Sequence, residues 1–170
     1  MANKLRELML LRHAKTDWKD NDLKDMDRPL SDKGKKNAVK MGKWLKDKNL
    51  MPDLILVSPA VRAQQTLKRI CNECSATAIT VDALYLAELD QLRQVLADAP
   101  HAERVMLIGH NPGLEKLFNL LVSEAPPSHV QLFPTCSMAH FILPSDWKNI
   151  EAGDGKLQQF ITAKEIKKSY

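Results

Sequence analysis

Short runs of apolar residues that stop abruptly at polar residues recur along the chain. Each run is continuous, which is typical of strands buried on both faces of a parallel sheet. The three clearest runs and the residues that end them are Leu8–Leu11 before Arg12-His13, Leu54–Val57 before Ser58-Pro59, and Val105–Ile108 before Gly109-His110-Asn111. A fourth candidate strand is Ile79–Tyr85, and Met138–Leu143 and Leu157–Ile161 are later candidates, for which an antiparallel arrangement stays open.

Between these runs the apolar positions change to a helical spacing. Ser31 is placed to cap a lysine-rich helix, and Ser58-Pro59 and Asn111-Pro112 each put a capping residue before a proline at the first helical position. The expected helices are residues 32–48, 59–71, 89–96 and 112–122. Alternating strands and helices predict an α/β fold with helices on both faces of the sheet.

Composition limits the class of protein. The chain has 170 residues, of which 44% are hydrophobic and 27% charged. At this length, folding buries about 70% of the surface of the unfolded chain, which is enough for a core without disulfides or metals. We therefore expect a single domain over residues 1–170 and exclude disordered, collagenous and multidomain proteins.

The positive charge is concentrated in one segment. The formal net charge is +4, and residues 31–48 alone hold seven lysines and two aspartates, a net of +5. The segment contains no arginine and no base-reading motif, so we interpret it as the solvated face of a helix and expect no nucleic-acid partner. Steering of an acidic partner is the alternative.

Three cysteines, an odd number, favour a reducing compartment, and we expect a cytoplasmic protein. Cys71 and Cys74 form a CxxC at the end of a predicted helix, which we interpret as helix-end packing or a surface thiol pair. No apolar run approaches the roughly 18 residues that span a membrane, and we expect neither a signal peptide nor a membrane partner.

The polar residues that end the strands suggest chemistry. In an α/β sheet, ligands bind beyond the carboxyl ends of the strands, where Arg12, His13, Arg62 and His110 are expected to meet. Two guanidiniums, two imidazoles and two helix N-termini favour a phosphoryl group. One imidazole can attack phosphorus while the other donates to an equatorial oxygen, with no metal required. Arg12-His13 alone would be interpreted as a loop pair, and Gly109-His110-Asn111 alone is compatible with a turn and a helix cap; the location of all three groups at the same end of the predicted strands is what favours an anion site.

Three ordered motifs resemble those of a known family. The segment Leu11–Thr16 is similar to the Arg-His-Gly signature of the histidine phosphatase superfamily, which includes the cofactor-dependent phosphoglycerate mutases. The segment Ser58–Thr66 resembles its Ser-Pro-x-x-Arg-Ala-x-x-Thr motif, and Gly109–Asn111 its third motif. The short chain and the Asp27–Ser31 segment ahead of the lysine-rich helix are most similar to SixA-type phosphohistidine phosphatases. The resemblance covers the chain from Leu8 to about Leu143.

The resemblance implies a three-layer α/β/α sandwich with a mostly parallel sheet, and a phosphoenzyme mechanism without a cofactor. In that mechanism His13 attacks the substrate phosphorus, Arg12, Arg62 and His110 hold the phosphoryl oxygens, and water hydrolyses the phosphohistidine. The catalytic candidates are therefore Arg12, His13, Arg62 and His110. Arg28 matches the Arg-Pro-Leu element of small members and is expected near the pocket mouth, either touching phosphate or ordering the loop.

Three positions depart from the family pattern. Ala14 replaces the usual glycine, and Lys19 stands where mutase-like members carry asparagine. Leu86 occupies the place of the usual glutamate proton donor, and Glu88, two residues later, is the candidate that a shift of the loop would bring into position.

A missing acid favours a labile phosphoryl donor, because an alkoxide leaving group needs a proton and a protonated imidazole does not. The expected function is a phosphatase acting on phosphohistidine in a protein, as a monomer. The alternatives are a phosphatase of small phosphorylated metabolites and a non-catalytic phosphate-binding module. A metallohydrolase is disfavoured because the five histidines lack metal-binding spacing, and His101, His129 and His140 are interpreted as loop or surface residues.

Overall fold

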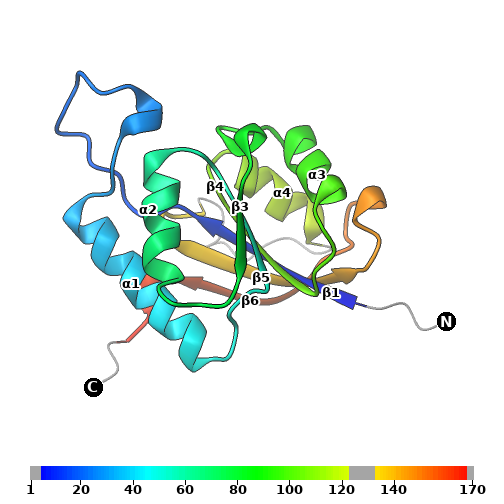
Figure 1. The fold of residues 1–170 in the computed structure, drawn as a ribbon. Coiled ribbons are helices and arrows are strands. Elements are labelled where there is room, and N and C mark those ends of the chain that lie inside the picture. The colour runs from blue at the N-terminus through cyan, green and yellow to red at the C-terminus, as the bar shows by residue number, and fades with distance from the viewer. Residues whose placement is uncertain (1–4, 123–132, 168–170) are drawn as a thin grey trace.

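A six-stranded sheet forms the middle layer of the computed structural model, which describes residues 5–122 and 133–167 (Figure 1). The strands are β1 (Leu5–Arg12), β2 (Leu54–Val57), β3 (Thr77–Thr80), β4 (Arg104–Gly109), β5 (Ser137–Pro144) and β6 (Lys156–Thr162). Their order across the sheet is β3-β2-β4-β1-β5-β6. Strands β1 to β4 pair with one another in parallel. Strand β5 pairs antiparallel with both β1 and β6. The mostly parallel sheet is confirmed, and the two later strands are antiparallel.

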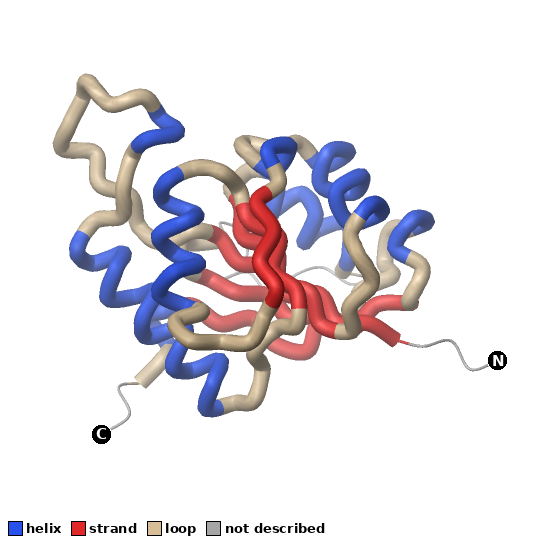
Figure 2. The backbone as a smooth tube through the Cα atoms, in the orientation of Figure 1, coloured by secondary structure: helices blue, strands red, loops and turns tan. Residues whose placement is uncertain are grey.

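Helices cover both faces of the sheet because successive residues of the central strands point to opposite sides. Leu8 and Leu10 of β1 belong to one apolar cluster, and Met9 and Leu11 to the other. The first cluster packs against α3 (Leu89–Asp98) and α4 (Gly113–Leu121), and the second against α1 (Asp32–Asp47) and α2 (Val61–Ile70). Figure 2 shows the helices on the two sides of the strands. The three-layer sandwich is confirmed.

One strand and two helices have bounds that differ from the prediction. The strand expected at Ile79–Tyr85 is β3, which ends at Thr80 and leads into the 3₁₀ helix η2 (Asp82–Leu84). Its partner β2 ends at Val57, opposite Thr80, so the ladder stops there. Helices α2 and α4 begin at Val61 and Gly113, two residues and one residue later than expected.

Cys71 and Cys74 are joined by a disulfide, which corrects the expectation of a thiol pair. Cys71 caps the C-terminal end of α2, as the sequence indicated. The turn after it, with Glu73 at a positive φ of 67°, brings the two Cα atoms to 5.0 Å, within the range that a disulfide spans. Among the residues that the structure describes, no helix is long and apolar enough to cross a membrane.

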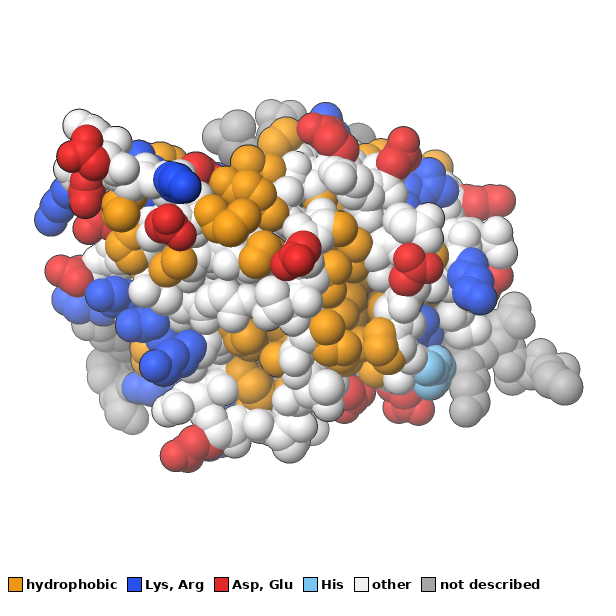
Figure 3. Space-filling model, turned by 45° about the horizontal axis from the view of Figure 1, so that its top comes forward, with side chains coloured by type: hydrophobic (Ala, Val, Ile, Leu, Met, Phe, Trp, Pro, Cys, Tyr) orange, Lys and Arg blue, Asp and Glu red, His pale blue; other side chains and the backbone are white. Residues whose placement is uncertain are grey.

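Helix α1 anchors the loop that follows β1. Ser31 caps α1 by accepting a hydrogen bond from the Gly34 amide at 3.0 Å, as predicted. The Ser31 amide and hydroxyl both donate to the Lys15 carbonyl, at 2.9 and 3.2 Å. Gly34 lies directly against the Lys15 backbone, where a side chain would collide. The N-terminus of α1 therefore holds the backbone two residues after His13. On its outer face, Lys and Arg side chains gather at the left of the molecule (Figure 3).

We expect Gly34→Ala to lower the free energy of unfolding by about 1 to 3 kcal/mol, although alanine is intrinsically the better helix former by about 1 kcal/mol. The added Cβ would meet the carbonyl of Lys15, which its bonds to Ser31 hold in place. Urea unfolding measures the change. Lys43→Ala, on the exposed face of the same helix, is the control and should stay within about 0.5 kcal/mol of the wild type. Equal stability of both variants would contradict this packing.

Candidate active site

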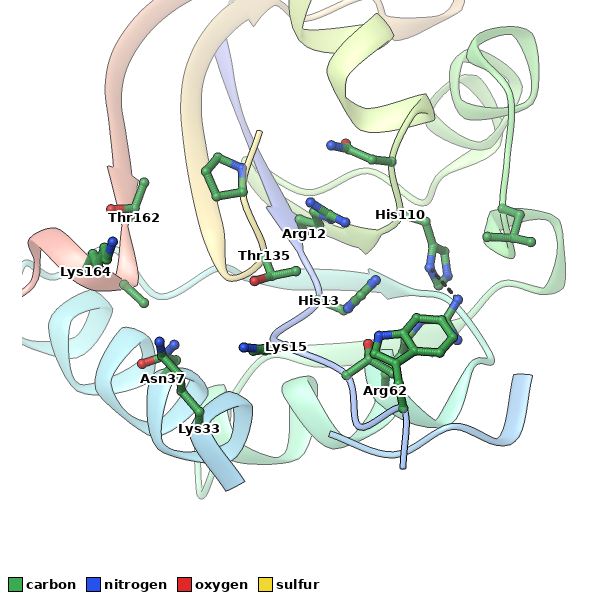
Figure 4. Close-up of a pocket in the computed structure, with 16 residues that line it drawn as sticks. Arg12, His13, Lys15, Lys33, Asn37, Arg62, His110, Thr135, Thr162 and Lys164 are labelled. Atoms are coloured by element: carbon green, nitrogen blue, oxygen red, sulfur yellow. Dashed lines mark hydrogen bonds between the residues drawn. The ribbon is translucent and has the colours of Figure 1, made fainter. Parts of the chain in front are cut away.

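Arg12, His13, Arg62 and His110 line one pocket of about 650 Å³ at the carboxyl ends of the parallel strands (Figure 4). Register explains why they meet. Arg12, the last residue of β1, is paired with Gly109, the last residue of β4, so the next residue of each strand enters the same space. The rings of His13 and His110 lie 5.2 Å apart. The structure thus brings together the four residues that the three motifs singled out.

His13 is held in one tautomer. Its Nδ1 lies 2.8 Å from the carbonyl oxygen of Ala14. A carbonyl only accepts, so Nδ1 carries the proton and Nε2 keeps its lone pair. The pKa of His13 is lowered to about 4, chiefly by burial and also by the neighbouring guanidiniums of Arg62 and Arg12, which together outweigh the bond to Ala14. The imidazole is therefore neutral at pH 7 and available as a nucleophile at Nε2.

His110 is also neutral. Burial, followed by the proximity of His13 and of the Arg62 guanidinium, lowers its pKa to about 3. A guanidinium only donates, so Nδ1 of His110 accepts from Arg62 at 3.4 Å. Its Nε2 then carries the proton and donates to the Ser58 hydroxyl, 2.7 Å away. Ser58 directly follows β2, and its hydroxyl also accepts from the Ala60 amide at 3.2 Å, just before α2 begins.

The pocket carries buried positive charge. Arg12 donates to the Phe133 carbonyl at 3.1 Å, and its buried Nε has no hydrogen-bond partner among the described residues. Burial lowers the pKa of Arg12, and the proximity of Arg62 lowers it further against the charge of Glu115. No carboxylate is among the described residues that line the pocket. Guanidiniums stay charged in proteins, so the pocket favours an anion.

Arg62 has partners that the sequence analysis missed. Its guanidinium donates to the Asp25 carbonyl at 2.7 Å and to the Asp25 carboxylate at 3.0 Å. Tyr85 donates to the same carboxylate, and its ring meets that of His110 edge-on at 5.7 Å. Asp25 begins the 3₁₀ helix η1 (Asp25–Asp27), 37 residues before Arg62, and no motif or periodicity marks such a contact.

Asp25 positions Arg62 and does not supply a proton. Burial opposes its ionisation, but the hydrogen bonds from Tyr85 and Arg62 outweigh burial and hold the pKa of Asp25 below its ordinary value. A carboxylate in that state is an acceptor at neutral pH. The Asp25 carboxylate thus orients one edge of the Arg62 guanidinium, while Arg62 still lines the pocket.

Thr66 connects the second motif to the nucleophile. Its buried hydroxyl accepts from the Ala14 amide at 3.0 Å and donates to the Arg62 carbonyl at 2.7 Å. Ala14, in the place of the usual glycine, is fully buried in the apolar cluster under α1 and α2. Its methyl group is accommodated there, and both its amide and its carbonyl serve to position other groups of the site.

Arg28 and Glu88 lie outside the pocket lining. Arg28 donates to the Asp20 carbonyl at 2.8 Å and lies 4.6 Å from the ring centre of Trp18, which does line the pocket. Both contacts are made within the loop between β1 and α1.

Glu88 caps α3 in a reciprocal pair with Gln91, forms an ion pair with Lys116 at 2.9 Å, and is 65% exposed at its side chain. The shift that would bring it to the pocket does not occur, because the cap fixes its backbone. Leu86 lines the pocket in its place.

The structure gives no support to a metal site. Among residues 5–122 and 133–167, no group of three or more histidine, cysteine, aspartate or glutamate side chains could hold a metal ion. His101 is exposed, as expected, and His129 lies outside the described residues. The interpretation of His140 as a surface residue is wrong: it is buried in β5, between two neighbouring strands, with its Nε2 2.8 Å from a Glu7 carboxylate oxygen.

We expect the His13 imidazole to remain neutral until the pH falls to about 4, because burial disfavours the cation. The NMR chemical shift of its Cε1–H group, followed against pH, measures this. The unfolded chain binds this proton near pH 6.5, so the folded state loses stability as the pH falls from about 6.5 towards 4. A titration midpoint of 6.5 or above for His13 would contradict the burial described here.

The chain is similar to known proteins in both sequence and structure. Residues 8–94 match the model of the histidine phosphatase superfamily (branch 1). An uncharacterised chloroplastic protein of Arabidopsis thaliana is 34% identical over 128 residues, which are 68% of this chain and 59% of that protein. The chain thus spans less than two thirds of the length of that relative.

Solved structures agree over nearly the full chain. The Nakamurella multipartitia protein assigned as phosphohistidine phosphatase SixA is 27% identical with a TM-score of 0.78, covering 93% of this chain and 96% of that one. A protein histidine phosphatase SixA in complex with tungstate is 25% identical with a TM-score of 0.75, covering 95% and 99%. The motif matches, the shared fold and the similarity to SixA together show that the chain belongs to the histidine phosphatase superfamily, among its SixA-type members.

Proposed function

We propose that the protein is a phosphatase that forms a covalent intermediate on Nε2 of His13. The observation that carries the proposal is the 2.8 Å bond from Nδ1 of His13 to the Ala14 carbonyl, which leaves Nε2 unprotonated within a basic pocket. In the first step Nε2 bonds to phosphorus and the bond from phosphorus to the leaving group breaks. In the second, the water oxygen bonds to phosphorus, the P–Nε2 bond breaks with its electron pair returning to Nε2, and phosphate leaves with the hydroxyl of the water while the second proton passes to a phosphate oxygen.

Arg12, Arg62 and His110 stabilise the phosphoryl oxygens in this proposal. Charge spreads over three equatorial oxygens in the transition state, and guanidinium groups bind such oxygens in pairs. A phosphoryl dianion beside His110 raises the pKa of its imidazole by favouring the cation. His110 then takes up a proton at Nδ1, the nitrogen that Arg62 contacts in the free pocket, and becomes a donor to the substrate.

The proposed substrate is phosphohistidine in a protein. No carboxylic acid lines the described part of the pocket, and Leu86 occupies the position where the resemblance places one. An alkyl phosphate would leave as an alkoxide that needs a proton from an acid, whereas a protonated phosphoimidazole leaves as neutral imidazole. The similarity to SixA structures supports the same substrate class, and tungstate in one of them is an oxyanion of phosphate-like shape.

Mixing the protein with ³²P-labelled phosphohistidine peptide and quenching within milliseconds should trap a label on the protein that is stable to base and labile to acid. We expect His13→Asn to abolish this label, because asparagine has no nucleophilic nitrogen. His101→Asn, which changes an exposed histidine outside the pocket, should retain it.

We expect Arg62→Ala to lower turnover by about 10²- to 10³-fold, the usual cost of removing one donor to a developing oxyanion.

A panel of substrates then separates the specific proposal from the general one. We expect kcat/KM for the phosphohistidine peptide to exceed that for glucose 6-phosphate by at least a hundredfold. Comparable turnover of the two would overturn the protein substrate and support a phosphatase of small metabolites. Binding of inorganic phosphate without any label or turnover would overturn the phosphatase itself and support a phosphate-binding module.

A further inference from the structure

A second hollow continues the active-site pocket along α1. It has a volume of about 510 Å³ and lies between α1 and the 3₁₀ helix η5 (Ala163–Glu165) with the residues after it. Lys33 and Asn37 line both hollows, so the two are contiguous. In Figure 4 the side chains of Lys15, Lys33 and Lys164 lie on one side of His13, and Arg62 and His110 on the other. The site is therefore elongated, with a phosphoryl end and a lysine end.

Seven lysines line this path, which we call the lysine groove. They come from three segments of the chain: Lys15, Lys33, Lys36, Lys40, Lys43, Lys164 and Lys167. None of the seven forms an ion pair with another described residue. Asp47 is the single carboxylate among the described residues that line the two hollows. The groove therefore holds a strong excess of uncompensated positive charge.

The lysines of α1 form a stripe and not a scattered surface. Lys33, Lys36, Lys40 and Lys43 follow the three- and four-residue spacing that places side chains on one face of a helix. Lys43 lies ten positions after Lys33, which corresponds to about 15 Å along the axis. The stripe starts at the pocket that contains His13 and leads away from it. Its far end is less polar, since Trp44 and Ile166 line the second hollow.

We propose that the lysine groove binds an acidic segment that flanks the phosphohistidine of the protein substrate. This inference rests on the proposed function, and it adds the feature of the substrate that is recognised. A segment with several aspartates or glutamates beside the phosphohistidine would complement the stripe while the phosphoryl group reaches His13. An apolar side chain at the far end would contact Trp44 and Ile166. Electrostatic attraction of this kind increases the rate of association and the discrimination between partners.

A nucleic-acid ligand fits these features less well. The cations of the groove are lysines, which bind as point charges, and arginine is absent from the part of the stripe that α1 supplies. Stacking platforms for single strands use several aromatic side chains, and Trp44 is the one aromatic residue among the described residues that line the second hollow. The connection to the pocket of His13 instead points to the protein that carries the phosphoryl group.

Two phosphohistidine peptides test the inference, one with four glutamates beside the phosphohistidine and one with glutamines in their place. We expect the wild type to hydrolyse the acidic peptide with a kcat/KM at least tenfold higher at 50 mM NaCl. The preference should arise mainly in KM and should decrease at 500 mM NaCl, because salt screens exposed charges.

Lys36→Glu combined with Lys43→Glu should abolish or invert the preference and leave kcat for the neutral peptide unchanged. Both residues are exposed on α1 and lie outside the pocket that contains His13. The matched control is Lys148→Glu combined with Lys156→Glu, which makes the same change in net charge at exposed positions outside the groove. The control should retain the preference of the wild type.

The outcomes separate the two proposals. If the wild type hydrolyses both peptides equally, or if both double variants lose the preference alike, the lysine groove is not the binding surface and the phosphatase proposal stands. If a 20-nucleotide DNA strand competes with the acidic peptide at lower concentration than a polyglutamate peptide does, the groove is a nucleic-acid surface and the inference is overturned. If neither peptide labels His13, the proposed function itself fails.

Discussion

The hydrogen bond between Nδ1 of His13 and the Ala14 carbonyl is the interaction on which the site depends. It selects the tautomer and aims Nε2 at the pocket. The Ala14 peptide is itself held, since Thr66 binds its amide and the cap of α1 holds the next carbonyl, that of Lys15. Two helices on one face of the sheet thus fix the backbone on both sides of one carbonyl group. The geometry of the nucleophile is a consequence of how α1 and α2 pack.

The charge states of the groups in the pocket depend on the same packing. Burial keeps both imidazoles neutral, and it also places two guanidiniums close together with Asp25 as a partner for one of them. Such an arrangement is costly without an anion, because buried charge is unfavourable unless it is paired. In the proposed mechanism a phosphoryl dianion accepts from the free donors and favours protonation of His110. The pocket is therefore complementary in charge to the proposed ligand.

Much of the fold follows from local pattern. Continuous apolar runs predict the strands, because a strand buried on both faces has no polar position, as Leu8–Leu11 shows. The meeting of Arg12, His13, Arg62 and His110 follows from the rule that parallel strands end at one edge. Asp25 and Tyr85 could not be predicted, since their contacts to Arg62 and to each other depend on the path of a loop. The interpretation of His140 as a surface residue is wrong because its burial depends on the position of β5 within the sheet, which the sequence of β5 does not reveal.

Glu88 shows why spacing alone misleads. Its position in the chain permits a role as an acid, but the same position also permits a helix cap, and the structure places it in the cap with Gln91. Leu86, with a positive φ of 48°, faces the pocket instead. An apolar side chain where an acid would act agrees with a leaving group that needs no proton from the enzyme, as proposed for phosphohistidine. The proposed choice of substrate therefore depends on one side chain, that of Leu86.

The most direct test of this account locates the phosphoryl group by NMR. Protein labelled with ¹⁵N in its histidines is phosphorylated at low temperature, and the coupling between ³¹P and ¹⁵N identifies the bonded nitrogen. We expect a coupling to Nε2 of His13, with Nδ1 protonated and donating to the Ala14 carbonyl. A phosphoryl group on Nδ1 of His13, or on His110, would contradict it.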